Sequence, residues 1–184
     1  MNFKNHISKA ITVIVIALLF SSFKASYWEL DKDSSATVYK SIAKIFNSET
    51  CNLDPIDDTF FSISEGDSII GYLAVTDAPS KFHRFDYYVL FNDKEEILKI
   101  EILQYRENYG AEICSKRWLR KFVGIDTKNS QAYHNTIDAI SGATISVNSL
   151  KYDVLKICKE LKLKHCSISL HEPKNYFFFA KSKN

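Results

Sequence analysis

The chain has 184 residues, of which 46% are hydrophobic and 25% are charged. This balance is typical of a globular protein and excludes an intrinsically disordered one. The formal net charge is only +2, which is too small to indicate a nucleic-acid partner. The length suits one compact domain with its own hydrophobic core, together with a short targeting segment.

The first 25 residues have the pattern of an export segment. Lys4 and Lys9 precede a short apolar run at residues 10–20, and small residues up to Ala25 follow it. This order is typical of a secretory signal. Because the run is shorter than the roughly 20 residues that span a bilayer, cleavage near Ala25 and retention as an N-terminal membrane anchor both stay open. In either case we expect an extracytoplasmic protein of the periplasm or cell envelope.

The first element expected after this segment is a helix over residues 34–47, where apolar residues recur at helical spacing. Ser34 or Ser35 is the expected N-cap. Residues 58–64 and 68–76 are rich in β-formers and flank a Glu-Gly-Asp turn, which predicts a hairpin.

A strand is expected at residues 85–91, followed by a turn and an alternating strand at residues 98–103. A loop at residues 106–111 leads into a short helix marked by Trp118, which ends at Gly124. The sheet is thus expected to have four or more antiparallel strands.

A polar loop at residues 126–135 precedes the longest expected helix, whose apolar positions recur from residue 147 to residue 161. Residues 167–171 are expected to form a final strand, and the apolar tail at residues 176–180 to pair at a sheet edge. Strands followed by segregated helices predict an α+β fold, an antiparallel sheet with a few packed helices.

We divide the chain into four parts: the export segment 1–25, an N-terminal helix and hairpin at 26–80, a core at 81–170 and a tail at 171–184. The middle two parts form a single domain. Its four cysteines are Cys51, Cys114, Cys158 and Cys166. Disulfides are permitted outside the cytoplasm, but the sequence does not choose a pairing, and buried thiols are an equally good interpretation. Their spacing matches no metal site.

Chemistry is concentrated in residues 138–146, Asp-Ala-Ile-Ser-Gly-Ala-Thr-Ile-Ser, directly before the long helix. Gly142 and Ala143 are small, so a bulky ligand can approach the backbone. A helix start offers unsatisfied N–H groups and a positive dipole end, which favour a phosphate. Hydroxyl groups at this position come from Ser141, Thr144 and Ser146. By these residues alone, an ordinary helix N-cap is the better interpretation.

Asp-x-x-Ser-Gly-Ala-Thr at residues 138–144 resembles the flavinylation motif of the FMN-binding domain family. That family includes the C subunit of the sodium-pumping NADH:quinone reductase and the G subunit of the Rnf complex. The resemblance implies that a separate, exported FMN transferase joins FMN through its phosphate to the hydroxyl of Thr144. It also implies that Asp138 is the acidic residue of the recognition motif of this transferase, and that residues 141–143 form the turn beneath the phosphate.

Residues 105–113, with the short helix after them, look like the second flavin-lining loop of the family. Many members have Glu-Thr-Pro-Gly where this chain has Glu-Asn-Tyr-Gly at residues 107–110. The resemblance implies that Glu107 and Tyr109 lie near the flavin ring or ribityl chain; simple loop packing of Tyr109 and a solvated Glu107 are the alternatives. For Trp118, core packing is favoured over flavin stacking. The expected cofactor-binding residues are Asp138, Ser141, Gly142, Ala143, Thr144, Ser146, Glu107, Asn108, Tyr109 and Gly110.

The leading hypothesis is an exported flavoprotein that carries FMN covalently and transfers electrons between membrane or exported redox proteins. No acid–base or nucleophile constellation appears, so no catalytic residue is expected. One alternative is an exported flavin-dependent reductase acting on a soluble acceptor. The other is an envelope binding module without flavin, in which Ser-Gly-Ala-Thr only caps a helix.

Overall fold

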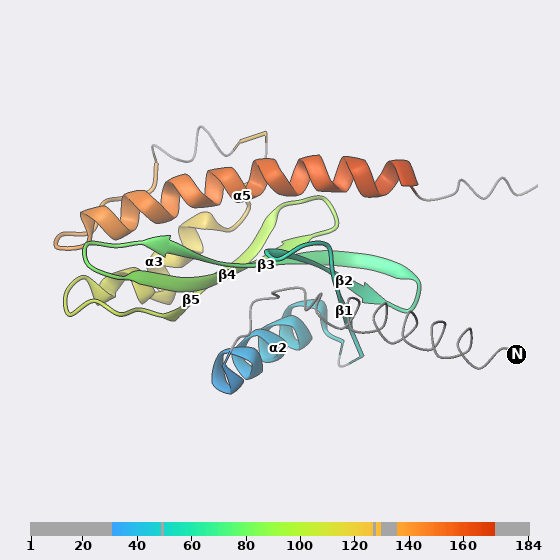
Figure 1. The fold of residues 1–184 in the computed structure, drawn as a ribbon, viewed down its shortest axis with the longest axis horizontal. Helices are drawn as coiled ribbons and strands as arrows, with labels where there is room; N and C mark the ends of the chain where they lie inside the picture. Colours follow the sequence, from blue (N-terminus) through green and yellow to red (C-terminus); the bar gives the residue numbers. More distant parts are fainter. Residues whose placement is uncertain (1–30, 49, 127, 130–135, 172–184) are drawn as a thin grey trace, which may run out of the picture.

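A computed structural model describes residues 31–48, 50–126, 128–129 and 136–171. Five antiparallel strands form one sheet in the order β1-β2-β3-β4-β5, so each strand pairs with the next along the chain. Helix α5 lies along one face of the sheet and α2 lies on the opposite face (Figure 1). The expected α+β class is confirmed. The export segment and the apolar tail at residues 176–180 lie outside the described residues.

The elements follow one another in a simple meander that ends in a long helix. Their bounds are α2 (Lys32–Phe46), β1 (Asn52–Pro55), β2 (Phe60–Glu65), β3 (Ser68–Pro79), β4 (Arg84–Asn92), β5 (Ile97–Gln104), η1 (Ala111–Cys114), α3 (Lys116–Leu119), η2 (Arg120–Phe122) and α5 (Thr144–His171).

Helix α2 begins earlier than the sequence predicts. Asp31 is its N-cap, and its carboxylate accepts hydrogen bonds from the backbone N–H groups of Asp33 and Ser34. The hydroxyl of Ser34 donates to the same carboxylate over 2.6 Å. The expected cap at Ser34 or Ser35 is therefore wrong, because the two oxygens of the upstream carboxylate satisfy several donors at once.

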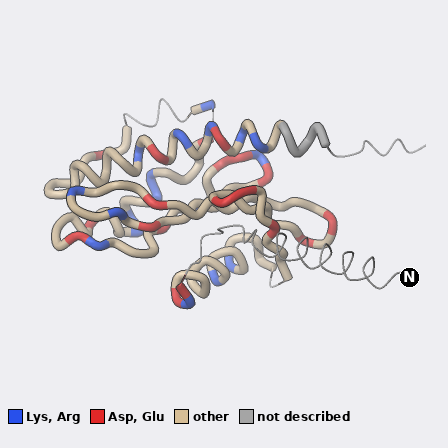
Figure 2. Tube along the Cα trace, viewed as in Figure 1, with Lys and Arg blue, Asp and Glu red and all other residues tan. Residues whose placement is uncertain are grey.

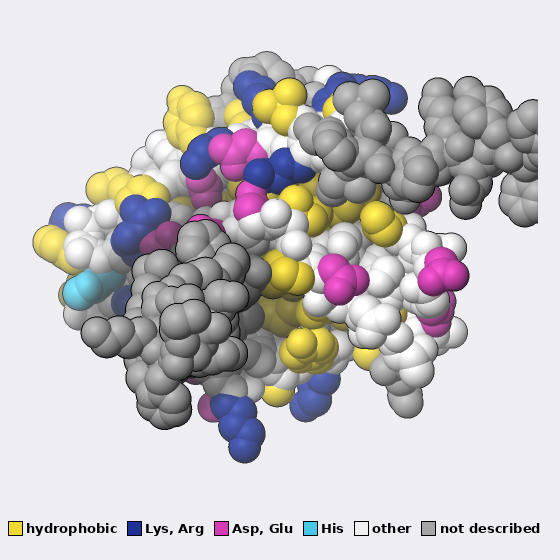
Figure 3. All heavy atoms as spheres, turned by 45° about the vertical axis from the view of Figure 1, so that its right-hand side comes forward, with side chains coloured by type: hydrophobic (Ala, Val, Ile, Leu, Met, Phe, Trp, Pro, Cys, Tyr) yellow, Lys and Arg dark blue, Asp and Glu magenta, His cyan; other side chains and the backbone are white. Residues whose placement is uncertain are grey.

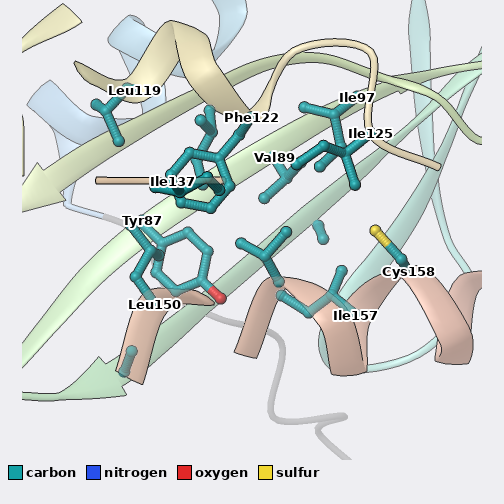
Figure 4. Packing of buried hydrophobic residues seen from close by; sticks show 14 of the residues in the cluster. Tyr87, Val89, Ile97, Leu119, Phe122, Ile125, Ile137, Leu150, Ile157 and Cys158 are labelled. Atoms are coloured by element: carbon teal, nitrogen blue, oxygen red, sulfur yellow. The ribbon is translucent and has the colours of Figure 1, made fainter. Parts of the chain in front are cut away.

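The two faces of the sheet each carry a hydrophobic core. Neighbouring side chains of a strand point to opposite faces, so the fully buried Tyr87 and Tyr88 belong to different cores. Tyr87 and Val89 of β4 point toward Leu150 and Ile157 of α5 (Figure 4). The core on the other face packs against α2 and contains Val38, Ile42, Ile63, Leu73, Val75, Tyr88 and Leu90.

The short helix expected around Trp118 is divided into three turns, η1, α3 and η2. Ser115 interrupts them with an extended backbone (φ −64°, ψ 122°). The segment still buries Trp118, Leu119 and Phe122 and ends before Gly124, whose φ is +84°. The core interpretation of Trp118 is therefore confirmed.

The strand expected at residues 167–171 is wrong, because α5 continues to His171. A five-residue run that contains two β-branched or aliphatic positions does not distinguish a strand from a helix by its periodicity. Extending a helix that has already formed adds one backbone hydrogen bond for each residue fixed. A new strand at this position would have needed an edge to pair with.

The charged surface is mixed in sign. Basic and acidic residues are both spread over the described chain in Figure 2, and hydrophobic, acidic and basic side chains lie next to one another in Figure 3. Ion pairs join Arg84 to Asp77 and Arg106 to Asp86. None of the described helices combines the length and apolar character that crossing a bilayer requires. The four cysteines are free thiols.

Candidate functional site

Three segments that are distant in sequence meet at one end of the sheet, near the start of α5 (Figure 1). They are the β3–β4 connection, the loop after β5 and the turn before α5. Between them lies a pocket of about 440 Å³, within the roughly 300–1,000 Å³ of small-molecule and cofactor sites. Its lining consists of Ser80, Lys81, Phe82, Tyr105, Glu107, Tyr109, Gly142, Ala143, Thr144, Ile145 and Ser146.

The turn before α5 presents Thr144 to this pocket. Gly142 has a φ of +80°, and the N–H of Ala143 donates to the carbonyl of Ile140 over 3.1 Å. Ala143 is buried, whereas Thr144 is exposed. The side chain of Thr144 is thus accessible from solvent.

The backbone at the start of α5 has N–H groups to offer a ligand. The carbonyl of Ala143 accepts the N–H of Val147 over 2.9 Å, the first hydrogen bond of the helix. The N–H groups of residues 144–146 therefore have no acceptor within α5. Thr144 is already the first helical residue, so neither it nor Ser146 occupies the capping position. Ala143 occupies the capping position of α5. It has no side-chain hydroxyl, so the interpretation of this motif as an ordinary side-chain N-cap does not hold.

Ser146 joins the three segments under the pocket. Its side chain is 2% exposed, and its hydroxyl oxygen lies 3.0 Å from the hydroxyl of Tyr105 and 2.5 Å from that of Ser80. The hydroxyl of Tyr105 also donates to the carbonyl of Tyr109 over 3.2 Å. Ser146 thus supports the floor of the site, because its hydroxyl is already engaged by neighbours from both of the other segments.

Glu107 holds the β3–β4 connection against the loop after β5. Its carboxylate accepts the backbone N–H groups of Phe82 over 2.7 Å and of His83 over 2.9 Å. These two hydrogen bonds hold the pKa of Glu107 below its ordinary value. The carboxylate is therefore ionised at neutral pH, and its hydrogen bonds fix the backbone that carries Phe82.

Gly110 lets the loop after β5 pack against the turn before α5. Its φ is +79°, and a Cβ atom there would lie 2.6 Å from the Cβ of Ala143 and 3.1 Å from the carbonyl oxygen of Gly142. A glycine is required both by this backbone conformation and by the close approach. The contact brings the two sequence motifs together at the pocket.

Asp138 lies outside the pocket lining. Its carboxylate forms an ion pair with Lys121, and its carbonyl accepts the indole N–H of Trp118 over 3.1 Å. The hydrogen bond from Lys121 lowers the pKa of Asp138. The Asp138 side chain is 71% exposed, so a protein that binds the turn from outside can reach it.

The model of the FMN-binding domain family matches residues 84–156. Residues 84–156 of this chain thus resemble an FMN-binding domain. The match confirms the resemblance that the motifs indicate, and it supports FMN as the cofactor of a flavin-binding protein. No curated protein matches the chain.

The fold brings six of the ten expected cofactor-binding residues to the pocket. They are Glu107, Tyr109, Gly142, Ala143, Thr144 and Ser146. Gly110 lies behind the wall, against Ala143. Asp138, Ser141 and Asn108 do not line the pocket, and all three are exposed.

Five lining residues were missed by sequence reasoning: Ser80, Lys81, Phe82, Tyr105 and Ile145. Tyr105 and Ile145 lie within the two motifs, residues 105–113 and 138–146, so their positions carried a signal. Residues 80–82 reach the pocket only because β3 pairs with β4 and because Glu107 accepts backbone N–H groups of this connection. No local pattern predicts such a contact.

The pocket fits FMN in its chemistry. The free N–H groups at the start of α5 suit a phosphate, and the exposed side chains of Phe82, Tyr109 and Ile145 offer apolar surface to a flat ring. Within the described residues, no group of three or more His, Cys, Asp or Glu is placed to hold a metal ion. The site is thus suited to an organic phosphate rather than to a metal.

Proposed function

We propose that FMN is joined to Thr144 by a phosphoester bond and that the protein transfers electrons between redox partners. The observation that carries this proposal is the position of Thr144. It ends the Ser-Gly-Ala-Thr motif, is exposed, and lines a pocket at the start of α5. The oxygen of Thr144 bonds to the phosphorus of an activated FMN donor, the P–O bond to the leaving group of that donor breaks, and the proton of the hydroxyl goes with the leaving group. Once bound, the flavin supplies the capacity to accept and release electrons.

The start of α5 supports a phosphate at Thr144 without a basic cluster. The N–H groups of residues 144–146 point out of the first helical turn, and the helix dipole places partial positive charge there. Lys81 is the one basic residue among the described residues that line the pocket. The backbone therefore supplies most of the stabilisation of the phosphate charge.

Two of the four titratable side chains of the pocket are already engaged, which leaves only Lys81 and Tyr109 among the described lining residues as proton donors for a stand-alone reductase. The four are Lys81, Tyr105, Glu107 and Tyr109. The carboxylate of Glu107 is already engaged by two backbone N–H groups, and the hydroxyl of Tyr105 by Ser146 and by the carbonyl of Tyr109. A reductase would need a proton donor free to serve its substrate.

The partners that we propose follow from the covalent attachment and from the export segment. An exported FMN transferase would form the bond, and the exposed Asp138 is available for its recognition. Outside the cytoplasm, unbound FMN is lost by dilution, and a covalent bond removes the need for tight binding. Electrons would then pass to and from membrane or exported redox proteins.

The test is to replace Thr144 in protein that is co-expressed and co-exported with an FMN transferase. Thr144→Ala is expected to abolish flavin that survives denaturation, because the acceptor oxygen is gone. Ser68→Ala is the control, since it removes an exposed hydroxyl at the start of β3, outside both motifs and the pocket, and is expected to keep the flavin. In-gel flavin fluorescence and circular dichroism check attachment and folding. Flavin that stays on denatured Thr144→Ala would show that the acceptor lies elsewhere.

A further inference from the structure

Exposed apolar side chains gather around the pocket. Tyr109 is 82% exposed and Phe82 is 74% exposed, the two highest values among the large hydrophobic side chains of the described residues. Ile145, also in the lining, is 51% exposed. Because the rest of the described aromatic residues are mostly buried, this concentration indicates that the pocket walls are completed by a ligand.

Phe82 belongs to a connection that hydrogen bonds hold in place. The N–H of Ser80 donates to the carbonyl of His83 over 2.8 Å, which closes the connection on itself. Glu107 accepts the N–H groups of Phe82 and His83, and the hydroxyl of Ser80 lies 2.5 Å from that of Ser146. An aromatic side chain that is exposed on a well-held backbone is preorganised for binding, because little further order is lost when a ligand arrives.

Tyr109 lines the same pocket from a different segment, the loop after β5. Tyr105 fixes its backbone through the hydrogen bond to the Tyr109 carbonyl, and Gly110 packs against Ala143 directly after it. Two aromatic rings are thus carried by two anchored loops around a pocket that begins at Thr144. A flat, aromatic ligand matches these walls better than an aliphatic one.

We propose that Phe82 and Tyr109 contact the isoalloxazine ring and that Glu107 is the positioning residue that holds Phe82 in the wall. This inference rests on the proposed attachment of FMN at Thr144. The β3–β4 connection then forms part of the flavin site although it precedes residues 84–156, which match the family. A redox partner that docks on the two aromatic side chains is the competing explanation of their exposure, and it predicts no contact with the ring.

The test uses the quenching of flavin fluorescence by tyrosine. A phenol ring in contact with an excited flavin donates an electron to it and quenches its fluorescence, whereas the phenyl ring of phenylalanine does not. Tyr109→Phe is expected to raise the fluorescence of the folded protein several-fold, and Phe82→Tyr is expected to lower it. Tyr39→Phe is the matched control, because Tyr39 is 58% exposed on α2, on the opposite face of the sheet. Its fluorescence is expected to equal that of the wild type.

Each fluorescence value is divided by that of the same sample after unfolding, and the mass of the Thr144 peptide gives the extent of loading. Full loading with unchanged fluorescence in both Tyr109→Phe and Phe82→Tyr would overturn the ring contacts and leave the covalent attachment intact. Absence of flavin from the wild-type peptide would instead overturn the proposed function itself.

The positioning role of Glu107 is tested in the Phe82→Tyr background. Adding Glu107→Ala removes the Oε1 atom that accepts both N–H groups and is expected to reverse the quenching that the Phe82→Tyr substitution causes, with loading at Thr144 unchanged. Adding Glu107→Gln keeps one acceptor oxygen and is expected to preserve most of the quenching. Equal quenching with and without Glu107→Ala would show that the carboxylate does not hold the ring at residue 82.

Discussion

Single residues at the pocket are constrained by backbone geometry as much as by chemistry, and Gly110 shows this most clearly. In Gly110→Ala, the added Cβ would lie 2.6 Å from the Cβ of Ala143, on a backbone with a φ of +79°. We expect the positive φ to cost about 1–2 kcal/mol and the overpacking to cost about 1–3 kcal/mol more. Urea denaturation would measure the loss of unfolding free energy.

Gly66→Ala is the control for this substitution. Gly66 also has a positive φ, +60°, but nothing lies within 4 Å of a Cβ added there. Only the backbone cost of about 1–2 kcal/mol is therefore expected, and flavin loading should be normal. Equal losses of stability in the two variants would contradict the close contact between the two motifs.

The elements around the site are held together by a few polar contacts within a largely apolar core. The hydroxyl of the fully buried Tyr87 in β4 donates to the carboxylate of Asp153 in α5 over 2.5 Å. Burial, with the nearby charge of Asp153, raises the pKa of Tyr87 well above its ordinary value, so the phenol keeps its proton. This contact fixes α5, and with it Thr144, on the sheet.

Tyr87→Phe is expected to lower the free energy of unfolding by about 1.5 kcal/mol, the low end of the range for a hydrogen bond to a charged group. The low end applies because the carboxylate of Asp153 is half-exposed and can bind water in place of the lost hydroxyl. Denaturation in urea measures the change. Tyr39→Phe, at an exposed position on α2, is expected to stay within about 0.5 kcal/mol of the wild type. A Tyr87→Phe protein as stable as this control would show that the hydroxyl contributes nothing to the docking of α5.

At the scale of the whole molecule, stability depends on carboxylates that the fold keeps ionised. Burial opposes the ionisation of Glu101, but hydrogen bonds from Lys99 and Tyr88 outweigh it and lower its pKa. The same balance holds for the pKa of Asp57, where hydrogen bonds from Lys164 and from backbone N–H groups outweigh burial. A lowered pKa in the folded state means that stability is present above the ordinary value and is lost as the pH falls.

Buried phenols and thiols, Tyr87 among them, set the alkaline limit of stability. Burial raises the pKa of Tyr88 and raises that of the Cys158 thiol to about 12, so the unfolded chain ionises before the folded one. The free energy of unfolding is therefore expected to be level near neutral pH, to fall below about pH 4.5 and to fall again above about pH 9. Urea denaturation across this range checks the profile. Stability that increases as the pH falls below about 4 would contradict it.

The sequence predicts β2 to β5 because these runs are rich in β-formers or alternate, and because Gly66 marks a turn, but it does not predict β1 (Asn52–Pro55). It predicts the pocket only in part. The motifs at residues 105–113 and 138–146 contain eight lining residues, but the wall at residues 80–82 arises from strand pairing and from the carboxylate of Glu107, which are tertiary contacts. The cap at Asp31 and the continuation of α5 to His171 were missed because several local patterns were compatible with those residues.

The attachment of FMN at Thr144 is tested most directly by the intact mass of the wild-type protein, co-expressed and co-exported with an FMN transferase. The account predicts a gain of one FMN less one water, located in the peptide that contains Thr144, and a band that stays fluorescent after denaturation. An unmodified and non-fluorescent protein, next to a positive control that the same transferase labels, would contradict it.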